Sequence, residues 1–277
     1  MTAVVDERIL ITGAGGGMGR ILRPRLARAG RTLRLLDVVA VAPAAEGEQV
    51  ETVTGSVSDF GAMLTACEGV DAIIHLGGLS KEAPFDEILE TNVKGTYCLL
   101  EAAHRQGVRR VVLASSNHAV GYASRDDAPP EGLPADLLPR PDSFYGWSKA
   151  ANESLGSLYA DTYGMDVFCL RIGSCFEEPA DLRGLTTWMS PDDAGKLMEA
   201  CLHTADGGFR LVWGISPNTR RWWSMTAGEE IGYHPLDDAE VFAGKLIDKF
   251  GEPDLTDPIH HLVGGKFCAV PLGERMS

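Results

Sequence analysis

The sequence lacks any apolar run long enough to span a bilayer, and residues 1–8 hold no apolar core like that of a signal peptide. Basic residues are also few, since 25 Lys and Arg face 39 Asp and Glu, which gives a net charge of −14. That balance argues against nucleic acid as a partner, because phosphate backbones recruit basic surfaces. We therefore expect a cytoplasmic protein that binds neither nucleic acid nor membrane.

Cysteine is scarce and scattered, with six residues in 277 and no Cys-x-x-Cys pair. This spacing predicts reduced thiols rather than a disulfide framework or a zinc site. The His260-His261 pair has no neighbouring cysteine or acid in a metal-ligand pattern. No metal site is predicted.

Short apolar runs alternate with helical segments over the first two-thirds of the chain. The runs end close to turn residues and are rich in Val and Ile, which is typical of buried parallel strands. This alternation predicts an α/β fold, a doubly wound parallel sheet. The expected strands are residues 8–12, 33–37, 51–54, 71–76, 110–115 and 166–171. The expected helices are residues 18–29, 85–106, 143–163 and 192–203, with another beginning at Asp59, which has the character of an N-cap.

The alternation weakens after Gly173, where prolines at 179, 191, 217 and 235 interrupt it. No flexible linker separates the two parts. We therefore expect one domain over residues 1–277, with residues from about 174 onward forming a small C-terminal substrate-binding lobe.

A glycine-rich segment follows the first expected strand and opens the first expected helix. Gly13, Gly16 and Gly19 have the spacing that lets a pyrophosphate approach a helix N-terminus, where amide groups favour negative charge. Asp37 ends the next strand and can accept hydrogen bonds from ribose hydroxyls while repelling the extra phosphate of NADP. This combination predicts a dinucleotide site that favours NAD, although Arg31 and Arg34 lie close by in sequence.

A tyrosine and a lysine four residues apart, Tyr145 and Lys149, lie in the helix expected over residues 143–163. This spacing puts both side chains on one helix face. An ammonium close to a phenol favours the phenolate, so Lys149 is expected to lower the pKa of Tyr145. Such a phenol can exchange a proton with a substrate hydroxyl near neutral pH.

Together with Asn92-Val-Lys-Gly95 and Ser115-Ser116, these motifs resemble the extended short-chain dehydrogenase/reductases, which have the Rossmann fold. The resemblance implies Tyr145 as the proton-transfer residue and Lys149 as its partner. It assigns the polarising group to Ser116 or Asn117 and leaves that choice open. It also implies pairing of subunits through the two long helices, and hence a homo-oligomer. The cofactor contacts that it implies are Gly13, Gly16, Gly17, Met18, Gly19, Asp37, Ser56, Val57, Leu76, Gly77, Gly78, Asn92, Tyr145, Lys149 and Cys175. Ser56 stands where the family usually has an acid that contacts adenine.

Further strings, among them residues 115–122, 171–175, 186–190, 212–214 and 264–267, resemble the uronate dehydrogenases. That resemblance implies NAD-dependent oxidation of the anomeric carbon of galacturonate or glucuronate to an aldarolactone. It implies Arg183 as the residue that binds the carboxylate, since a guanidinium can do so with two hydrogen bonds. The substrate contacts that it implies are Ser80, Ser116, Asn117, His118, Tyr145, Ser174 and Arg183.

Structural roles remain open for several of these residues. Ser80 could cap the following helix, His118 could be a loop histidine bonded to backbone, and Arg183 could be solvated. His75 and Arg171 are interpreted as structural residues, and the tryptophans at 188, 213, 222 and 223 as packing residues.

Two other functions stay open. The first is a nucleotide-sugar epimerase or dehydratase of the same fold, for which the region after Gly173 is short. The second is an NAD-sensing regulator without catalysis, which would have no need of both Tyr145 and Lys149.

Overall fold

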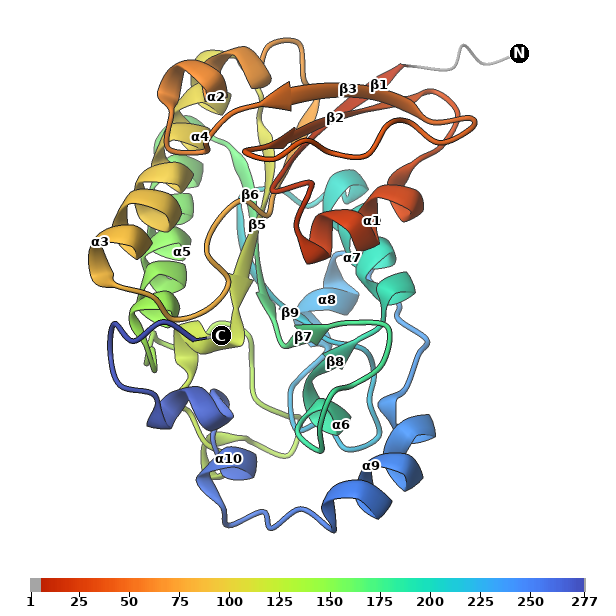
Figure 1. Cartoon of the computed structure of the whole chain (residues 1–277), viewed down its shortest axis with the longest axis vertical. Helices are drawn as coiled ribbons and strands as arrows, with labels where there is room; N and C mark the ends of the chain where they lie inside the picture. The colour runs from red at the N-terminus through yellow and green to blue at the C-terminus, as the bar shows by residue number, and fades with distance from the viewer. Residues whose placement is uncertain (1–5, 277) are drawn as a thin grey trace.

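A seven-stranded parallel sheet forms the centre of the computed structural model, which describes residues 6–276. The strand order is β3-β2-β1-β4-β5-β6-β9 (Figure 1). The strands are β1 (Glu7–Thr12), β2 (Arg31–Asp37), β3 (Gln49–Thr54), β4 (Ala72–His75), β5 (Arg110–Ser116), β6 (Asp166–Ile172) and β9 (Phe209–Gly214). The strand order reverses between β1 and β4, and ligands bind doubly wound sheets at the carboxyl ends beside such a point. The predicted doubly wound fold is confirmed.

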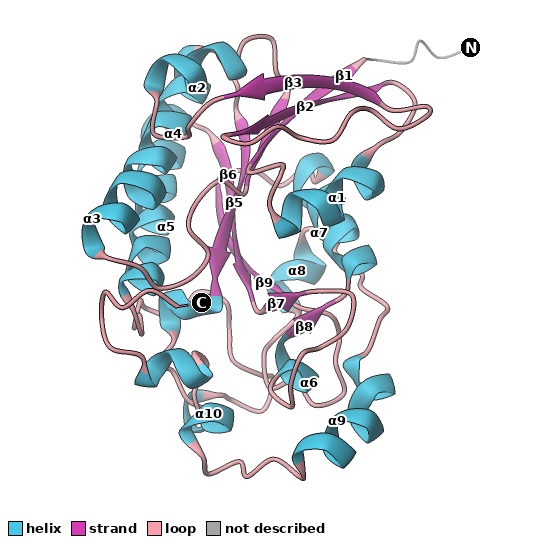
Figure 2. Ribbon diagram, in the orientation of Figure 1, coloured by secondary structure: helices cyan, strands magenta, loops and turns pink. Residues whose placement is uncertain are grey.

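Helices cover both faces of the sheet (Figure 2). One face carries α2 (Phe60–Ala66), α3 (Phe85–Ile88), α4 (Gly95–Arg105) and α5 (Phe144–Tyr163). The other carries α1 (Gly17–Leu26), α7 (Pro191–His203) and α8 (Thr226–Glu230). The lower part of Figure 1 holds a two-stranded sheet of β7 (Ser174–Cys175) and β8 (Trp188–Met189), with α6 (Gly184–Thr187), α9 (Ala243–Phe250) and α10 (Pro258–His261). Single 3₁₀ turns span Asn117–Val120, Arg125–Asp127, Ala239–Phe242 and Gly265–Ala269.

Two apolar layers, one on each face of the sheet, make up most of the core. Leu22 and Leu197 pack in the layer under α1 and α7, and Met63 and Leu99 in the layer under α2 and α4. All four tryptophans have the packing role expected from the sequence, and Trp222 packs edge-on against Trp223. Trp213 and Trp223 contact each other with ring centroids 4.5 Å apart, and Trp188 packs on Phe242.

The expected long helix over residues 85–106 is a helix with an internal irregularity. A π-helical segment, Leu89–Lys94, joins α3 to α4. Asn92 lies within it, and widened turns of this kind are frequent at functional sites. The cap expected at Asp59 is confirmed, because its Oδ1 accepts hydrogen bonds from the amides of Gly61 and Ala62.

The sequence analysis missed the seventh strand. β9 pairs in parallel with β6, and α7 packs against α1 on the sheet. The segment from residue 174 onward therefore adds a helix and a strand to the main sheet as well as the small elements beyond it. A glycine pair precedes β9 and Pro217 follows it, and its partner strand lies about forty residues earlier, so local pattern did not reveal the pairing.

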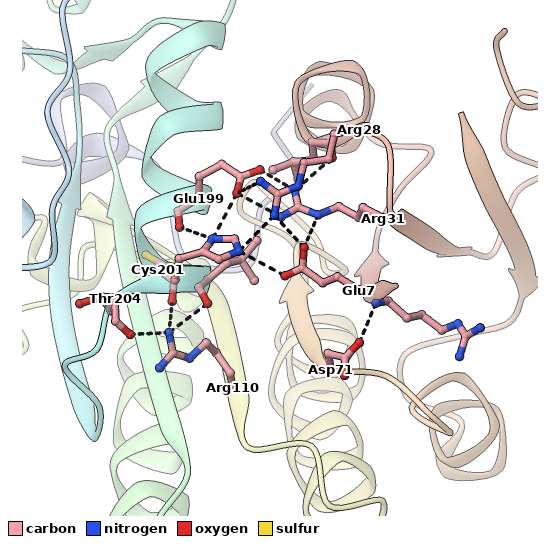
Figure 3. Close-up of polar contacts among 12 residues, drawn as sticks. Glu7, Arg28, Arg31, Asp71, Arg110, Glu199, Cys201 and Thr204 are labelled. Carbon is pink, nitrogen blue, oxygen red and sulfur yellow. Dashed lines mark hydrogen bonds and ion pairs between the residues drawn. The ribbon is translucent and has the colours of Figure 1, made fainter. Parts of the chain in front are cut away.

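An ion-pair network ties α7 to the amino ends of β1 and β2, at the edge of the sheet opposite the carboxyl ends (Figure 3). The Arg31 side chain is fully buried and contacts Glu7 at 2.7 Å and Glu199 on α7. Arg110 donates to the carbonyls of Cys201 and Thr204, which closes the C-terminal end of α7. The carboxylates of Glu7 and Glu199 lie 2.7 Å and 2.5 Å from the Arg31 guanidinium. Without these partners, burial of the charge would lower the stability of the fold.

Within residues 6–276, no helix is both long and apolar enough to cross a membrane. The same range holds no group of three or more His, Cys, Asp or Glu arranged to bind a metal ion. All six cysteines are free thiols, as expected.

Candidate active site

A pocket of about 340 Å³ lies at the carboxyl ends of β1, β2 and β4. Eight of the residues assigned to the cofactor from the sequence line it: Gly13, Gly16, Asp37, Ser56, Val57, Leu76, Gly77 and Gly78. Four parts of the chain, separated by up to 65 residues, thus meet where the glycine motif predicts a dinucleotide.

Two glycines of the motif are required by close backbone contacts. Gly13 has a φ of +68°, and a Cβ there would lie 2.8 Å from the Gly77 nitrogen. A Cβ on Gly19 would lie 2.5 Å from the Ala14 carbonyl oxygen, so this glycine brings α1 close to the first strand. Gly16 is the N-cap of α1, and Gly17 and Met18 begin the helix. A helix N-terminus open to a pocket in this way fits a pyrophosphate.

Backbone amides of the glycine-rich turn and of the loop after β2 hold the Asp37 side chain in place. Its carboxylate accepts hydrogen bonds from the amides of Gly15 at 2.8 Å and Val39 at 3.1 Å. The two arginines that complicated the prediction are engaged elsewhere: Arg31 in the network of Figure 3, and Arg34 with Glu51 at 2.7 Å. Asp37 is therefore the charged side chain that lines this pocket.

Asn92 and Cys175 do not line the pocket. The Asn92 side chain accepts from the Leu79 amide and donates to the Leu79 carbonyl and to Ser148. It thereby holds the loop after β4 against α5. Cys175 is 8% exposed and belongs to the apolar core.

Tyr145 and Lys149 lie in the first turns of α5, where Ser143 caps the helix by accepting from the Gly146 amide. Both residues are buried, at 7% exposure each. The Lys149 ammonium donates to the Ala114 carbonyl at 2.7 Å and lies 5.6 Å from the centre of the Tyr145 ring. The predicted shared face is confirmed.

The pKa of Tyr145 differs from the expectation. Burial raises it to about 12, and a hydrogen bond from Ser116 lowers it only in part. Burial also lowers the pKa of Lys149 to about 8. The prediction of a lowered Tyr145 pKa is wrong for this structure, because loss of hydration outweighs the neighbouring hydroxyl and the ammonium is bonded to backbone.

The two serines that end β5 have different roles. Ser115 donates to Glu153, which is paired with Arg171 at 2.8 Å in a buried ion pair. Arg171 is thus structural, as expected. Ser116 lies beside Tyr145 and donates to the Asn117 side-chain oxygen at 3.1 Å, while its own oxygen accepts from the His118 amide.

Asn117 is wholly buried, and its amide nitrogen donates to the Val263 carbonyl at 3.2 Å. Both ends of its side chain therefore have protein partners. Ser116 is the hydroxyl that contacts Tyr145, and Asn117 links the end of β5 to the C-terminal segment.

An acid that the sequence analysis did not select organises His118. Asp142 has a fully buried side chain, and its Oδ2 lies 2.7 Å from His118 Nδ1. Its other oxygen accepts from the Ser143 hydroxyl. Burial lowers the pKa of His118, while Asp142 raises it in part. With Nδ1–H donating to the carboxylate, neutral His118 keeps Nε2 as an acceptor.

The C-terminal segment closes over this histidine. Phe267 stacks on His118 with ring centroids 3.8 Å apart, and 6.4 Å separates Phe267 from the Tyr145 ring. Glu82 accepts from the amides of Tyr145 and Gly273, so it joins α5 to the tail. Asp142 directly precedes Ser143, the cap of α5, and that position was the only sequence signal for it; no local pattern marked Glu82.

Three substrate residues expected from the sequence lie on separate segments. Arg183 is the N-cap of α6, and its Nη2 donates to the Val263 carbonyl at 2.5 Å. Its charge lowers the pKa of His118, so the two residues are near neighbours. Ser174 lies 3.4 Å from the Thr187 hydroxyl. Ser80 is exposed and does not cap α3, whose N-cap is Pro84.

Known proteins match this arrangement over most of the chain. The model of the NAD dependent epimerase/dehydratase family matches residues 9–184. This chain belongs to that family. A uronate dehydrogenase of Pseudomonas syringae is 42% identical over 97% of this chain and 96% of its own. The resemblance to the uronate dehydrogenases is confirmed.

Solved structures give the same result. The uronate dehydrogenase of Agrobacterium tumefaciens superposes with a TM-score of 0.88 at 40% identity, covering 96% of this chain and 97% of that one. The glucuronic acid dehydrogenase of Chromohalobacter salexigens superposes with a TM-score of 0.90 at 38% identity, covering 96% and 98%. The shared fold therefore includes the segment from residue 174 onward.

Proposed function

We propose that this protein is an NAD-dependent dehydrogenase that oxidises the anomeric carbon of hexuronates, D-galacturonate and D-glucuronate, to the aldarolactone. The observation that carries the proposal is a cluster of polar side chains around Tyr145, whose ring centroid lies 5.8 Å from that of His118. It brings the Tyr145 phenol, the Ser116 hydroxyl and the His118–Asp142 pair together with Arg183. The names of the similar proteins support the same assignment.

The reaction removes a proton and a hydride from a cyclic hemiacetal. Bound NAD supplies the hydride acceptor and a positive ring charge that favours a nearby anion. Burial raises the pKa of Tyr145 to about 12, so the charges of bound NAD and Lys149 would have to lower it; as phenolate, Tyr145 would then take the proton of the anomeric hydroxyl. The carbon–hydrogen bond breaks with its electron pair leaving as hydride, and the ring oxygen stays bonded, which gives a lactone.

The neighbours of Tyr145 have separate tasks in this proposal. The Ser116 hydroxyl, which donates to Asn117 in the structure, would turn its single proton toward the phenolate or the reacting oxygen, so we favour Ser116 over Asn117 as the polarising residue. Lys149 places its ammonium 5.6 Å from the centre of the Tyr145 ring, although burial lowers its pKa to about 8. The His118 Nε2 lone pair accepts from a sugar hydroxyl.

Arg183 provides the charge for the substrate carboxylate. Among residues 6–276 no carboxylate forms an ion pair with it, and burial lowers its pKa. A guanidinium held by one carbonyl keeps further donors for a bidentate contact. Ser80 and Ser174 complete the proposed substrate contacts, and α6, α9 and α10 form the proposed substrate lobe.

The test is an Arg183→Ala variant assayed with galacturonate and with galactose, its neutral counterpart. Loss of a charged pair in a desolvated site costs about 2 kcal/mol or more, so KM for galacturonate should rise about 30-fold or more. Galactose kinetics should not change. Arg221→Ala, an exposed neighbour of the same type, is the control. Unchanged KM for galacturonate in Arg183→Ala would show that another residue binds the carboxylate.

Two relatives define the other sugars that the assay must include. A protein of Haloferax volcanii named NAD-dependent glucose-6-phosphate dehydrogenase is 36% identical over 88% of this chain. A second, named L-arabinose 1-dehydrogenase, is 35% identical over 84%. An epimerase or dehydratase would act only on a nucleotide sugar. An NAD sensor would turn over none of the sugars.

We also propose a cytoplasmic homo-oligomer. The two helical segments expected to pair carry exposed apolar side chains, namely Phe85, Leu89, Tyr97, Leu158 and Tyr163. Six free thiols suit a reducing compartment.

A further inference from the structure

A second pocket, here called the distal pocket, lies beyond Arg183 and has a volume of about 300 Å³. Arg125, Arg183, Trp222, His260 and Val263 are among its lining residues. Neither Tyr145 nor any residue of the nucleotide pocket lines it. Its volume is at the small end of the range for ligand sites, about 300–1,000 Å³, which suits one sugar ring.

The distal pocket and the proposed catalytic site share a wall. The Val263 carbonyl accepts hydrogen bonds from Arg183 Nη2 at 2.5 Å and from Asn117 Nδ2 at 3.2 Å. Asn117 in turn accepts from Ser116, which lies beside Tyr145. Arg183 lines the distal pocket on one side and neighbours His118 on the other.

Arg125 is one of three arginines in the lining of the distal pocket, which also holds one acid, Glu252. Its Nε donates to the His260 carbonyl at 2.9 Å, and no acid in residues 6–276 forms an ion pair with it. Burial lowers its pKa, with no acid opposing that effect. Arg220, by contrast, is neutralised by Glu240 at 2.7 Å. A partly buried guanidinium without a counter-ion is costly, and an anionic ligand would offset that cost.

An aromatic surface adjoins this charge. The Arg125 guanidinium lies 4.9 Å from the centre of the Trp222 ring, which also lines the distal pocket. Aromatic walls with a few placed polar groups are typical of small-molecule sites. The apolar face of a sugar ring suits the indole, and a carboxylate suits Arg125.

The proposed reaction fixes which part of a substrate faces the distal pocket. The anomeric carbon must face Tyr145, and the carboxylate faces Arg183. That carboxylate is carried by C5, so the neighbouring C4 hydroxyl lies at the same end of the ring. A substituent on the C4 oxygen would therefore extend past Arg183.

We infer that the distal pocket binds the second ring of a 4-O-linked diuronide, whose reducing end is oxidised in the catalytic site. The second carboxylate pairs with Arg125 and the second ring packs on Trp222. The chemistry is unchanged: hydride leaves the anomeric carbon for NAD, a proton is released, and the glycosidic bond stays intact. This inference rests on the proposed uronate dehydrogenase function.

The test compares α-1,4-digalacturonate with galacturonate as substrates of the full-length protein. NADH formation gives the kinetics, and mass spectrometry shows whether an intact disaccharide has lost two hydrogens. The parent protein should oxidise both. Arg125→Gln should lower kcat/KM for digalacturonate about tenfold or more and change that for galacturonate less than twofold. Arg221→Gln, which alters a nearby exposed arginine outside the distal pocket, should change neither.

The outcomes separate the two claims. Normal galacturonate turnover by Arg125→Gln also shows that the variant is folded. Oxidation of galacturonate without oxidation of the disaccharide would overturn the inference and leave the proposed function standing. So would an Arg125→Gln variant that uses the disaccharide as well as the parent does. Failure with both substrates would overturn the proposed function itself.

Discussion

Replacement of Asp142 by Asn should impair the site without changing its shape. In the parent protein, Asp142 Oδ2 lies 2.7 Å from His118 Nδ1 and its Oδ1 accepts from Ser143. An Asn side chain has the same size and can keep the Ser143 contact, but it then presents an NH₂ group to His118. The ring must accept at Nδ1 and carry its proton on Nε2. The acceptor that we propose for a sugar hydroxyl becomes a donor.

The size of the effect follows from the lost contact. A hydrogen bond to a charged group contributes about 1.5–3 kcal/mol, so kcat/KM for galacturonate should fall about 10- to 100-fold. Asp126→Asn is the matched control, because Asp126 faces His261 at 3.3 Å but its side chain is 85% exposed. That variant should retain parental kinetics.

The pH profile separates positioning from a merely structural role. Neutral His118 is required, so kcat/KM should fall as pH drops through the His118 pKa, which burial places below its usual value. Asp142 raises that pKa in part, so its removal should move the acidic limb to still lower pH. Loss of activity in Asp142→Asn with an unmoved acidic limb would refute this reasoning.

Three further predictions concern other parts of the protein. Tyr145→Phe should lower kcat about 10²- to 10⁴-fold while NAD affinity, measured by calorimetry, stays within twofold; a sensor would show no catalytic rate to lose. Asp37→Ser should raise the ratio of kcat/KM for NADP to that for NAD about 10- to 100-fold, since a like-charge contact costs a few kcal/mol, and an unchanged ratio would remove Asp37 from cofactor selection. Light scattering should give twice the monomer mass or more, and Leu158→Glu, at a side chain 57% exposed, should shift it toward the monomer if α5 forms the interface.

Local pattern was sufficient for much of the fold. The apolar strand before Gly13, the 3.6-residue spacing of Tyr145 and Lys149 and the cap at Asp59 are all short-range features, and the structure has each of them. Ligands bind parallel sheets at the carboxyl ends of the strands, and this generalisation places Asp37 and Gly77 at one pocket although 40 residues separate them.

Contacts between distant segments could not be predicted in this way. The His118–Asp142 pair spans 24 residues, and the bonds from Asn117 and Arg183 to Val263 span 146 and 80. The pKa of Tyr145 depends first on burial, to which Phe267 of the C-terminal segment contributes, and then on Ser116 and Asp142. Sequence spacing predicted only the effect of Lys149 and gave no measure of burial, so the predicted direction of the pKa shift was wrong.

The most direct test of the central claim is NADH absorbance at 340 nm after mixing the purified protein with NAD and one sugar at a time. The sugars are galacturonate, glucuronate, galactose, glucose 6-phosphate and L-arabinose, with NADP in place of NAD as the cofactor control. The account predicts rapid NADH formation with either uronate and NAD, and little with galactose or with NADP. No NADH formation with either uronate would contradict the account, and turnover of galactose at the uronate rate would contradict the role of Arg183.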